Sequence, residues 1–350
     1  MTRLLVVRLG SLGDLVHALP AVAALRRAHP AAQIDWLVDA AHREFLELVP
    51  VVSSLVVLRE QTARAWLEVR RELRGRHYDA AIDFQGLLKS AALARLSGAR
   101  RVVGFDRGSL RERSAAPFYT ERVETGEGQH VIEKNLRLAR ALGAEPGPHE
   151  FPLAPVRSAP VDAVVAQAGA PLALVNPGAA WPNKRWPVDR FARIAVHVRA
   201  RHGLAPLVLW GPGEIDLARA IAHAAGGVAI VAPDTRLPDL VAAARAARLI
   251  VSGDTGPLHS AAAVGVPAVA LFGPTNPRRN GPWQPQDISL TRYESCDCHY
   301  ERRCRHDASG WCLGTITADE VIDAIDRRLG AAAAADAPDA GVPGPTDLSA

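Results

Sequence analysis

Short apolar runs rich in Val, Leu and Ile recur along the chain and predict buried strands. Several are followed by a glycine-containing turn and then by apolar residues at helical spacing. The runs lie at residues 3–8, 33–39, 53–58, 78–84, 102–105, 172–175, 207–210, 249–251 and 266–272. Alternating strands and helices of this kind predict an α/β fold with parallel sheets that are covered on both faces.

The most informative stretch is residues 249–275, which read LIVSGDTGPLHSAAAVGVPAVALFGPT. It predicts a strand, a glycine turn, a helix N-terminus capped by Asp254 or Thr255, and a second strand. The free N–H groups and positive dipole end of such a helix favour an anion, typically a phosphate, and Gly256 lets a ligand approach the backbone. His259 follows about one turn later and is expected to face the same ligand. An ordinary βαβ turn without a ligand explains this stretch alone equally well.

The first strand is followed by a similar unit, the turn Leu-Gly-Ser-Leu-Gly-Asp at residues 9–14 and a helix over 15–28. The turn is not GxGxxG, so the dinucleotide fingerprint is absent and a nicotinamide oxidoreductase is disfavoured. Asp14 lies in the first helical turn, where the helix dipole stabilises its ionised form. It is either a plain N-terminal cap or a general base at the mouth of a cleft.

The length of 350 residues and a proline-rich linker predict two domains. The linker spans residues 145–162 and contains five prolines. We expect domains at 1–155 and 163–330, and a disordered tail of Ala, Pro, Asp and Gly at 331–350. Two doubly wound, Rossmann-like domains place a site in the central cleft, at the carboxyl ends of both sheets.

Polar residues of the glycine turns are expected to line this cleft from both sides. One wall would carry Asp14 and Lys89. The other would carry Lys184, Glu214, Asp254 and His259. A base opposite an anion site predicts group transfer from a phosphorylated donor.

Composition narrows the function classes. The net charge is +4 and no long basic run is present, so a nucleic-acid partner is not expected. Arg8 and Asp14 interrupt the apolar N-terminal run, which excludes a signal peptide, and no apolar stretch is long enough for a bilayer span. The protein is therefore expected to be cytoplasmic, with its cysteines reduced.

Basic residues are unevenly distributed along the first domain. Between Arg59 and Arg122 there are fourteen Lys or Arg and eight Asp or Glu. A predicted helix at 59–76 carries many of the arginines. Most of these arginines are expected to form a solvated basic face. The excess of positive charge would suit an acidic acceptor bound to this domain.

Four motifs, in order along the chain, resemble the ADP-heptose:lipopolysaccharide heptosyltransferases, a family of inverting, metal-independent glycosyltransferases with the GT-B fold. They are RLGSLGDLVHALPAVAALR near the N-terminus, DFQGLLKSA at 83–91, NPGAAWPNKRWP at 176–187, and DTGPLH with LFGPT in the second domain. The resemblance covers residues 1 to about 325 and implies transfer of heptose from ADP-heptose, without a catalytic cofactor. The implied acceptor is acidic, most simply the lipopolysaccharide inner core, with peripheral contact at the cytoplasmic face of the inner membrane.

The resemblance also implies roles for single residues. Asp14 matches the position of the family's catalytic base. Lys184 matches a position that contacts the donor diphosphate, and Glu214 matches a position that recognises the nucleoside. The donor-binding turn corresponds to Asp254, Thr255, Gly256 and His259. Independently of the resemblance, the excess of positive charge leads us to expect that Lys89, Arg64, Arg70 and Arg71 bind the acceptor. In the branch that adds the first heptose, two threonines stand where this chain has Ala179 and Ala180.

Two rival functions stay open on the sequence alone. One is a transferase of the same fold that uses another nucleotide sugar or a protein acceptor, because the fold does not determine the substrate. A non-catalytic nucleotide-sugar-binding protein is the other.

All four cysteines lie within seventeen residues, spaced C-x-C-x5-C-x7-C. They are Cys296, Cys298, Cys304 and Cys312. Four thiolates suit zinc or iron, and His299 and His306 are substitutes for one of them. We expect a structural metal that braces the second domain, and the alternative is a loop of reduced thiols. This segment is absent from the first-heptose branch.

Overall fold

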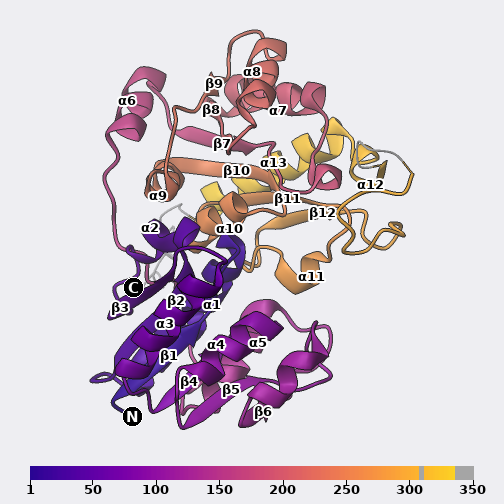
Figure 1. Cartoon of the computed structure of the whole chain (residues 1–350). Helices are drawn as coiled ribbons and strands as arrows, with labels where there is room; N and C mark the ends of the chain where they lie inside the picture. Colours follow the sequence, from indigo (N-terminus) through magenta and orange to yellow (C-terminus); the bar gives the residue numbers. More distant parts are fainter. Residues whose placement is uncertain (307–310, 336–350) are drawn as a thin grey trace, which may run out of the picture.

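The computed structural model describes residues 1–306 and 311–335, which form two α/β domains (Figure 1). Each domain contains a parallel sheet of six strands. The first sheet has the order β3-β2-β1-β4-β5-β6 and the second the order β12-β11-β10-β7-β8-β9. In each sheet the chain changes its direction of travel at the two central strands, β1 and β4 in the first and β7 and β10 in the second.

Five strands of the first domain match the predicted apolar runs closely, and the short edge strand Glu121–Val123 was not predicted. The strands are β1 (Arg3–Val7), β2 (Gln33–Asp39), β3 (Ser54–Leu58), β4 (Ala80–Asp83), β5 (Arg101–Phe105) and β6 (Glu121–Val123). The helices around them are α1 (Leu12–Ala28), α2 (Arg43–Leu46), α3 (Ala63–Gly75), α4 (Leu88–Leu96) and α5 (Val131–Arg140), with short 3-10 turns η1 (Ala40–His42) and η2 (Arg113–Phe118).

The second domain repeats this plan. Its strands are β7 (Leu172–Asn176), β8 (Ala205–Val208), β9 (Ile230–Val231), β10 (Ala247–Gly253), β11 (Ala268–Phe272) and β12 (Ile288–Thr291). Its helices are α6 (Ala159–Ala168), α7 (Val188–His202), α8 (Ile215–Ala224), α9 (Leu237–Arg245), α10 (Gly256–Ala263), α11 (Pro277–Asn280), α12 (Trp311–Gly314) and α13 (Ala318–Ala335), with η3 (Pro182–Lys184).

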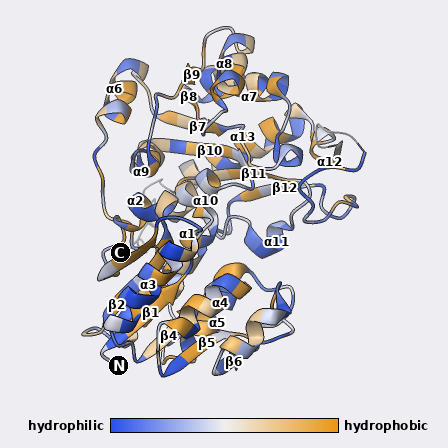
Figure 2. Cartoon of the chain, in the orientation of Figure 1, coloured by the Kyte–Doolittle hydropathy of each residue, from blue (hydrophilic) through white to orange (hydrophobic). Residues whose placement is uncertain are grey.

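The central strands are buried on both faces because helices cover each sheet. Residues Leu4 to Val7 of β1 and all of β7 are buried. In Figure 2 these strands are mainly orange, whereas the outer face of α3 is blue. Apolar burial on this scale, at about 25 cal/mol per Å², is the main favourable term for each domain. Among the described residues, no helix is both long and apolar enough to cross a membrane.

Two segments differ from the sequence prediction. The last four residues of the predicted linker already belong to α6, because Ser158 caps its first turn and proline is tolerated there. The predicted disordered tail begins at Ala331, but α13 continues to Ala335. Five consecutive alanines, with the highest helix propensity, explain the extension. Residues 336–350 lie outside the described part of the chain.

Candidate functional site

The four sequence motifs converge because each follows a strand at a topological switch point. The turns after β1 and β4 lie side by side in the first sheet, and those after β7 and β10 lie side by side in the second. Helices α1 and α10, which begin at two of these turns, contact each other across the two domains (Figure 1). Ligands of doubly wound folds bind at such positions.

Asp14 is the third residue of α1 and is held by its own turn. Its carboxylate accepts hydrogen bonds from the N–H (3.2 Å) and the hydroxyl (2.9 Å) of Ser11. It also pairs with the guanidinium of Arg8 at 2.6 Å. Arg8 in turn donates to the carbonyl of Phe84 (2.6 Å) in the turn after β4. About a third of the Asp14 side chain, 33%, is exposed, so it is accessible to a ligand.

The surroundings of Asp14 favour its ionised form. Burial alone would raise the pKa of this carboxyl, but the charge of Arg8 and the hydrogen bonds from Ser11 outweigh burial and lower the pKa below its ordinary value. Asp14 is therefore a carboxylate at neutral pH, which is the form that accepts a proton.

Asp254, at the end of β10, is a second carboxylate in a comparable position with very different partners. It accepts hydrogen bonds from Lys184 (2.5 Å), Thr275 (2.8 Å), Asn280 (2.6 Å) and His259 (3.2 Å). Only 6% of its side chain is exposed. Thr255 is the N-cap of α10, but neither side chain caps the helix, in contrast to the sequence expectation. Asp254 instead joins four segments of the second domain.

Lys184 is bound to this carboxylate. Its ammonium also lies 3.3 Å from the Asp254 carbonyl oxygen and 4.6 Å from the centroid of the Trp181 ring. Burial alone would raise the pKa of Asp254, but the hydrogen bond from His259 and the charge of Lys184 hold it well below the ordinary range. Because an ammonium has three N–H groups and Asp254 engages two, one remains for a further anion.

Glu214 connects the turns after β7 and β8. Its carboxylate accepts hydrogen bonds from Arg185 (3.1 Å) and from the N–H of Gly211 (3.1 Å). A Cβ atom at Gly178 would collide with the same carboxylate, so this position requires glycine. Glu214 thus lies at the carboxyl ends of the strands, on the same edge of the sheet as Lys184.

The two glycine turns pack directly against each other. A Cβ atom at Gly256 would lie 2.8 Å from the side chain of Leu12, and one at Gly13 would collide with the ring of His259. In this structure the close approach that Gly256 permits is therefore made by the first domain. His259 is buried against the first domain and does not face open space.

A cluster of histidines completes this contact. The ring of His17 lies 4.4 Å from that of His259 and 5.5 Å from that of His130. His17 Nε2 and His259 Nδ1 are buried and have no hydrogen-bond partner in the described part of the chain. Burial, together with the neighbouring histidine charges, holds the pKa of His17 well below its ordinary value, so its ring is neutral at pH 7.

Sequence reasoning did not assign several residues of this site. Arg8 and His17 stand inside the N-terminal motif, and Asn176 and Thr275 stand inside motifs of the second domain. The amide of Asn176 donates to the Thr255 hydroxyl at 2.9 Å and so fixes the start of α10. Their position inside the motifs is what could have marked them as part of the site. Their contacts could not be predicted, because these join residues that are far apart in the chain.

The predicted acceptor residues lie on two different helices. Lys89, half-buried, is at the start of α4, directly after β4 and at the switch point. Arg64, Arg70 and Arg71 lie on α3, which follows β3, the edge strand two positions from β1. Arg64 pairs with Glu68 at 2.9 Å, so part of the basic excess is neutralised within the helix.

The cysteines gather but do not form a ready metal site. Cys296, Cys298 and Cys312 are buried in one cluster with the partly buried Cys304. Burial and neighbouring thiols raise the pKa of Cys312, whose neighbours include Cys296 and Cys304. Among the described residues, the sulfurs do not form a group of three or more ligand atoms within 4.8 Å of one another. The metal stays a prediction.

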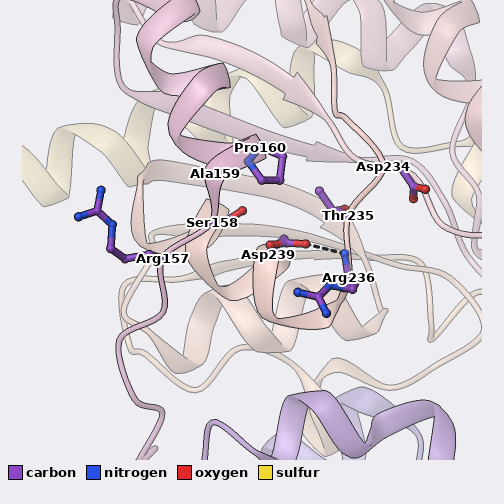
Figure 3. Close-up of a pocket in the computed structure, with 8 residues that line it drawn as sticks. All are labelled: Arg157, Ser158, Ala159, Pro160, Asp234, Thr235, Arg236 and Asp239. Atoms are coloured by element: carbon purple, nitrogen blue, oxygen red, sulfur yellow. Dashed lines mark hydrogen bonds between the residues drawn. The ribbon is translucent and has the colours of Figure 1, made fainter.

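Figure 3 shows a separate pocket of about 500 Å³ between the N-terminal ends of α6 and α9. It is lined by Arg157, Ser158, Ala159, Pro160, Asp234, Thr235, Arg236 and Asp239. The backbone N–H of Arg236 donates to Asp239 across its floor at 2.8 Å. None of the predicted site residues lines this pocket.

Comparison with known proteins gives consistent matches along the chain. The family model for glycosyltransferase family 9 (heptosyltransferase) matches residues 66–309. The lipopolysaccharide heptosyltransferase 1 of Pseudomonas aeruginosa is 34% identical over 318 residues, covering 87% of this chain and 88% of that protein. The corresponding Escherichia coli K12 enzyme is 28% identical over 291 residues, covering 79% and 89%.

Solved structures agree with the sequence comparison. A family 9 glycosyltransferase from Veillonella parvula has a TM-score of 0.82 at 25% identity and covers 94% of this chain and 98% of its own. The E. coli heptosyltransferase WaaC with ADP-2-deoxy-2-fluoro heptose has a TM-score of 0.72 at 26% identity, with coverage of 93% and 99%. The predicted fold of two Rossmann-like domains, GT-B, is confirmed.

Proposed function

This chain belongs to glycosyltransferase family 9, and on that premise we propose that it transfers heptose from ADP-heptose to the inner core of lipopolysaccharide. The observation that carries the proposal is the meeting of two helix N-termini across the domains. One presents an ionised, accessible carboxylate, and the other presents the free N–H groups and the lysine that suit a diphosphate.

The second domain is proposed to bind the donor. The N-terminus of α10, with Thr255 and Gly256, would receive the diphosphate together with the remaining N–H of Lys184. Glu214, at the end of the neighbouring strand, would accept hydrogen bonds from the nucleoside hydroxyls. Asp254 and His259 would act behind them, holding Lys184 and the helix in place.

The first domain is proposed to supply the base. Asp14 takes the proton from an acceptor hydroxyl as the acceptor oxygen forms a bond to the anomeric carbon of the heptose. In the same step the bond from that carbon to the phosphate oxygen breaks, and ADP leaves with its charge stabilised by Lys184 and the α10 N-terminus. A single displacement inverts the anomeric configuration, and no step requires a metal.

Donor binding requires a movement at the domain contact. Leu12 lies against Gly256, at the position that a phosphate would occupy. We therefore infer that the α1 and α10 ends separate when ADP-heptose enters and close again around it. Domain movements of this kind exclude water and complete a site after substrate binds.

The acceptor is proposed to bind along the basic side of the first domain. Lys89 lies at the switch point, and Arg70 and Arg71 extend the positive surface along α3. An inner core rich in anionic groups suits such a surface, and the same charge would bring the protein to the cytoplasmic face of the inner membrane. Charge reversal of Arg70 and Arg71 should raise the KM for acceptor more than that for donor.

The test of the function is direct. Purified protein is incubated with ADP-heptose and a lipopolysaccharide acceptor that lacks heptose, and the product is followed by mass spectrometry and NMR. We expect addition of one heptosyl group with inverted anomeric configuration. Transfer from another nucleotide sugar but not from ADP-heptose would overturn the donor assignment, and transfer only to a protein would overturn the acceptor assignment.

A structural zinc or iron held by the cysteine cluster is a separate part of the proposal. The donor set suits either metal, and the four sulfurs already lie in one cluster beside β11. A metal would have to draw the sulfurs closer together, because among the described residues they do not form a group of three or more ligand atoms within 4.8 Å of one another. Elemental analysis of untagged protein should find one metal per chain. The double variant Cys296→Ser/Cys298→Ser should contain no metal at this site. Substoichiometric metal in the wild type, with four freely titrating thiols, would contradict the proposed metal site.

A further inference from the structure

A second group of metal-ligand side chains lies where α7 contacts α13 in the second domain. His197 and His202 of α7 and Asp326 of α13 each offer one ligand atom, and these atoms lie within 4.8 Å of one another. The Nε2 atoms of the two histidines are 2.7 Å and 2.6 Å from the same oxygen of Asp326. We propose that these three residues form a binding site for a divalent transition metal of the zinc class.

The chemistry of the donors selects this class of ion. Imidazole nitrogens suit zinc, copper, nickel and ferrous iron, whereas magnesium and calcium prefer oxygen ligands. Three protein ligands leave one position of a tetrahedral zinc site for water. With metal–ligand distances of about 2.0–2.2 Å, such ligands lie about 3.3 Å apart. Each histidine nitrogen, now 2.7 Å or 2.6 Å from the Asp326 oxygen, would therefore move roughly 0.6–0.7 Å farther from it.

The local structure holds the three ligands in one place. His202 is the last residue of α7, which Gly203 ends in the left-handed conformation. The carboxyl end of a helix dipole favours a cation. The histidine rings are 5.6 Å apart at an angle of 69°, so both present their Nε2 atoms to Asp326 without stacking on each other.

The site is accessible and lies outside the transfer machinery. The side chains of His197, His202 and Asp326 are 21%, 20% and 41% exposed, which allows an ion to enter from solvent. His202 ends the helix that begins directly after Lys184 and Trp186, so the length of α7 separates the site from the proposed donor position. At about 1.5 Å per residue this is about 20 Å.

A bound metal would fasten α13 to α7. The two helices are already joined by the pair Arg193 and Asp319 at 2.7 Å. Arg193 lies about one turn before His197 on α7, and Asp319 lies about two turns before Asp326 on α13. At the other end of this contact a metal would replace the hydrogen bonds of His197 and His202 to Asp326 with stronger connections, so we expect it to stabilise the second domain without entering the chemistry.

The test uses the full chain without a histidine tag, stripped with chelator and titrated with Zn²⁺ by calorimetry, together with thermal unfolding. We expect one zinc at this site with micromolar or tighter affinity, and a rise in Tm of a few degrees when zinc is about 100-fold above Kd. Asp326→Asn should weaken this binding at least tenfold and remove the rise. Because asparagine still accepts hydrogen bonds from both histidines, its Tm without zinc should stay close to that of wild type.

Two further measurements distinguish this site from the cysteine cluster and from single surface histidines. His202→Ala should lose the same zinc equivalent, whereas His223→Ala, at an exposed histidine of α8, should keep it. Co²⁺ bound at this site should give visible d–d absorption without a thiolate-to-cobalt band. Equal zinc affinity in wild type and Asp326→Asn, or cobalt binding only with a thiolate band, would overturn the proposal; the second result would assign the metal to the cysteines.

Discussion

The turns after β1 and β10 are built alike and meet across the domains, yet their carboxylates have different surroundings. Asp14 is 33% exposed and is held by one arginine and one serine. Asp254 is 6% exposed and accepts four side-chain hydrogen bonds, one of them from Lys184. Both lie where a strand leads through a glycine-containing turn into a helix, Asp14 in the first turn of α1 and Asp254 just before α10, so the motif alone does not decide what its carboxylate does.

The difference in exposure and partners indicates that one carboxylate takes part in the reaction and the other holds its neighbours in place. A carboxylate that reacts with a substrate hydroxyl has to reach it within hydrogen-bond distance, and the partly exposed Asp14 can do so. The lone pairs of Asp254 are already occupied by protein donors, and burial isolates it from any acceptor. We therefore assign the reaction to the first turn and the positioning of Lys184 to the second, and the following experiments test that division.

The largest expected effect is on turnover in Asp14→Asn. Removal of a general base lowers the rate by about 10²–10⁴-fold. Asparagine keeps the size of the side chain and can still accept a hydrogen bond from Ser11, and Arg8 keeps its hydrogen bond to the Phe84 carbonyl. Loss of the partly exposed pair with Arg8 should therefore cost about 1 kcal/mol or less, and ADP binding should stay near wild type. Steady-state kinetics and calorimetry with ADP measure both quantities, and near wild-type turnover would remove Asp14 from the mechanism.

The next effect is on stability in Asp254→Asn. Breaking a buried ion pair by removing one partner costs about 3–5 kcal/mol, because the remaining charge of Lys184 is left uncompensated. Denaturant unfolding should show this loss. Asp216→Asn, at a side chain 93% exposed, is the matched control and should change stability by less than about 0.5 kcal/mol. A loss no greater in Asp254→Asn than in the control would exclude the supporting role.

A smaller effect is expected on donor affinity in Lys184→Ala. A hydrogen bond between charged groups contributes about 1.5–3 kcal/mol, so ADP should bind about 10- to 150-fold more weakly. Asp254 keeps its hydrogen bonds from Thr275, Asn280 and His259, which limits the accompanying loss of stability. Calorimetry with ADP is the measurement, and Lys134→Ala, outside the motifs, should bind as wild type. Equal ADP affinity in the two variants would rule out the lysine contact.

The smallest effect concerns the pH dependence of the domain contact. The pKa of His17 is lowered in the folded state, so the unfolded chain binds more protons as pH falls below about 6.5, and stability falls with it. A single group of this kind contributes at most about 1.4 kcal/mol per pH unit. His17→Leu should remove that contribution, and unfolding free energies measured between pH 7 and 5 test it. An unchanged slope would show that another group titrates there.

Much of the fold could be predicted from the sequence, because strands buried on both faces read as continuous apolar runs. The run at 33–39 coincides with β2 as observed. The glycine turns were also evident, since glycine and a helix-capping residue mark them locally. The boundary at α6 was missed because a proline-rich segment reads as a linker even where proline begins a helix.

The site could be predicted only as a set of candidates. Gly256 was expected to let a ligand approach, but the contact it makes here is with Leu12, which lies in the other domain. Likewise the burial of His259 against Gly13, and the bonds of Asn280 and Thr275 to Asp254, join residues that are distant in sequence. No local pattern encodes these pairings. Those of Gly256 with Leu12 and of His259 with Gly13 depend on how the two domains meet, and those of Asp254 depend on how the second domain folds.

The most direct test is to measure unfolding free energy and single-turnover rate, with saturating ADP-heptose, on the same preparations of Asp14→Asn and Asp254→Asn. If the two carboxylates have different roles, each variant should lose mainly one of the two measured quantities. Asp14→Asn should lose about 1 kcal/mol of stability or less and react about 10²–10⁴-fold more slowly. Asp254→Asn should lose about 3–5 kcal/mol of stability and, under conditions where it is folded, react faster than Asp14→Asn. If Asp254→Asn retains stability and loses turnover as Asp14→Asn does, the two carboxylates share one role and the assignment is wrong.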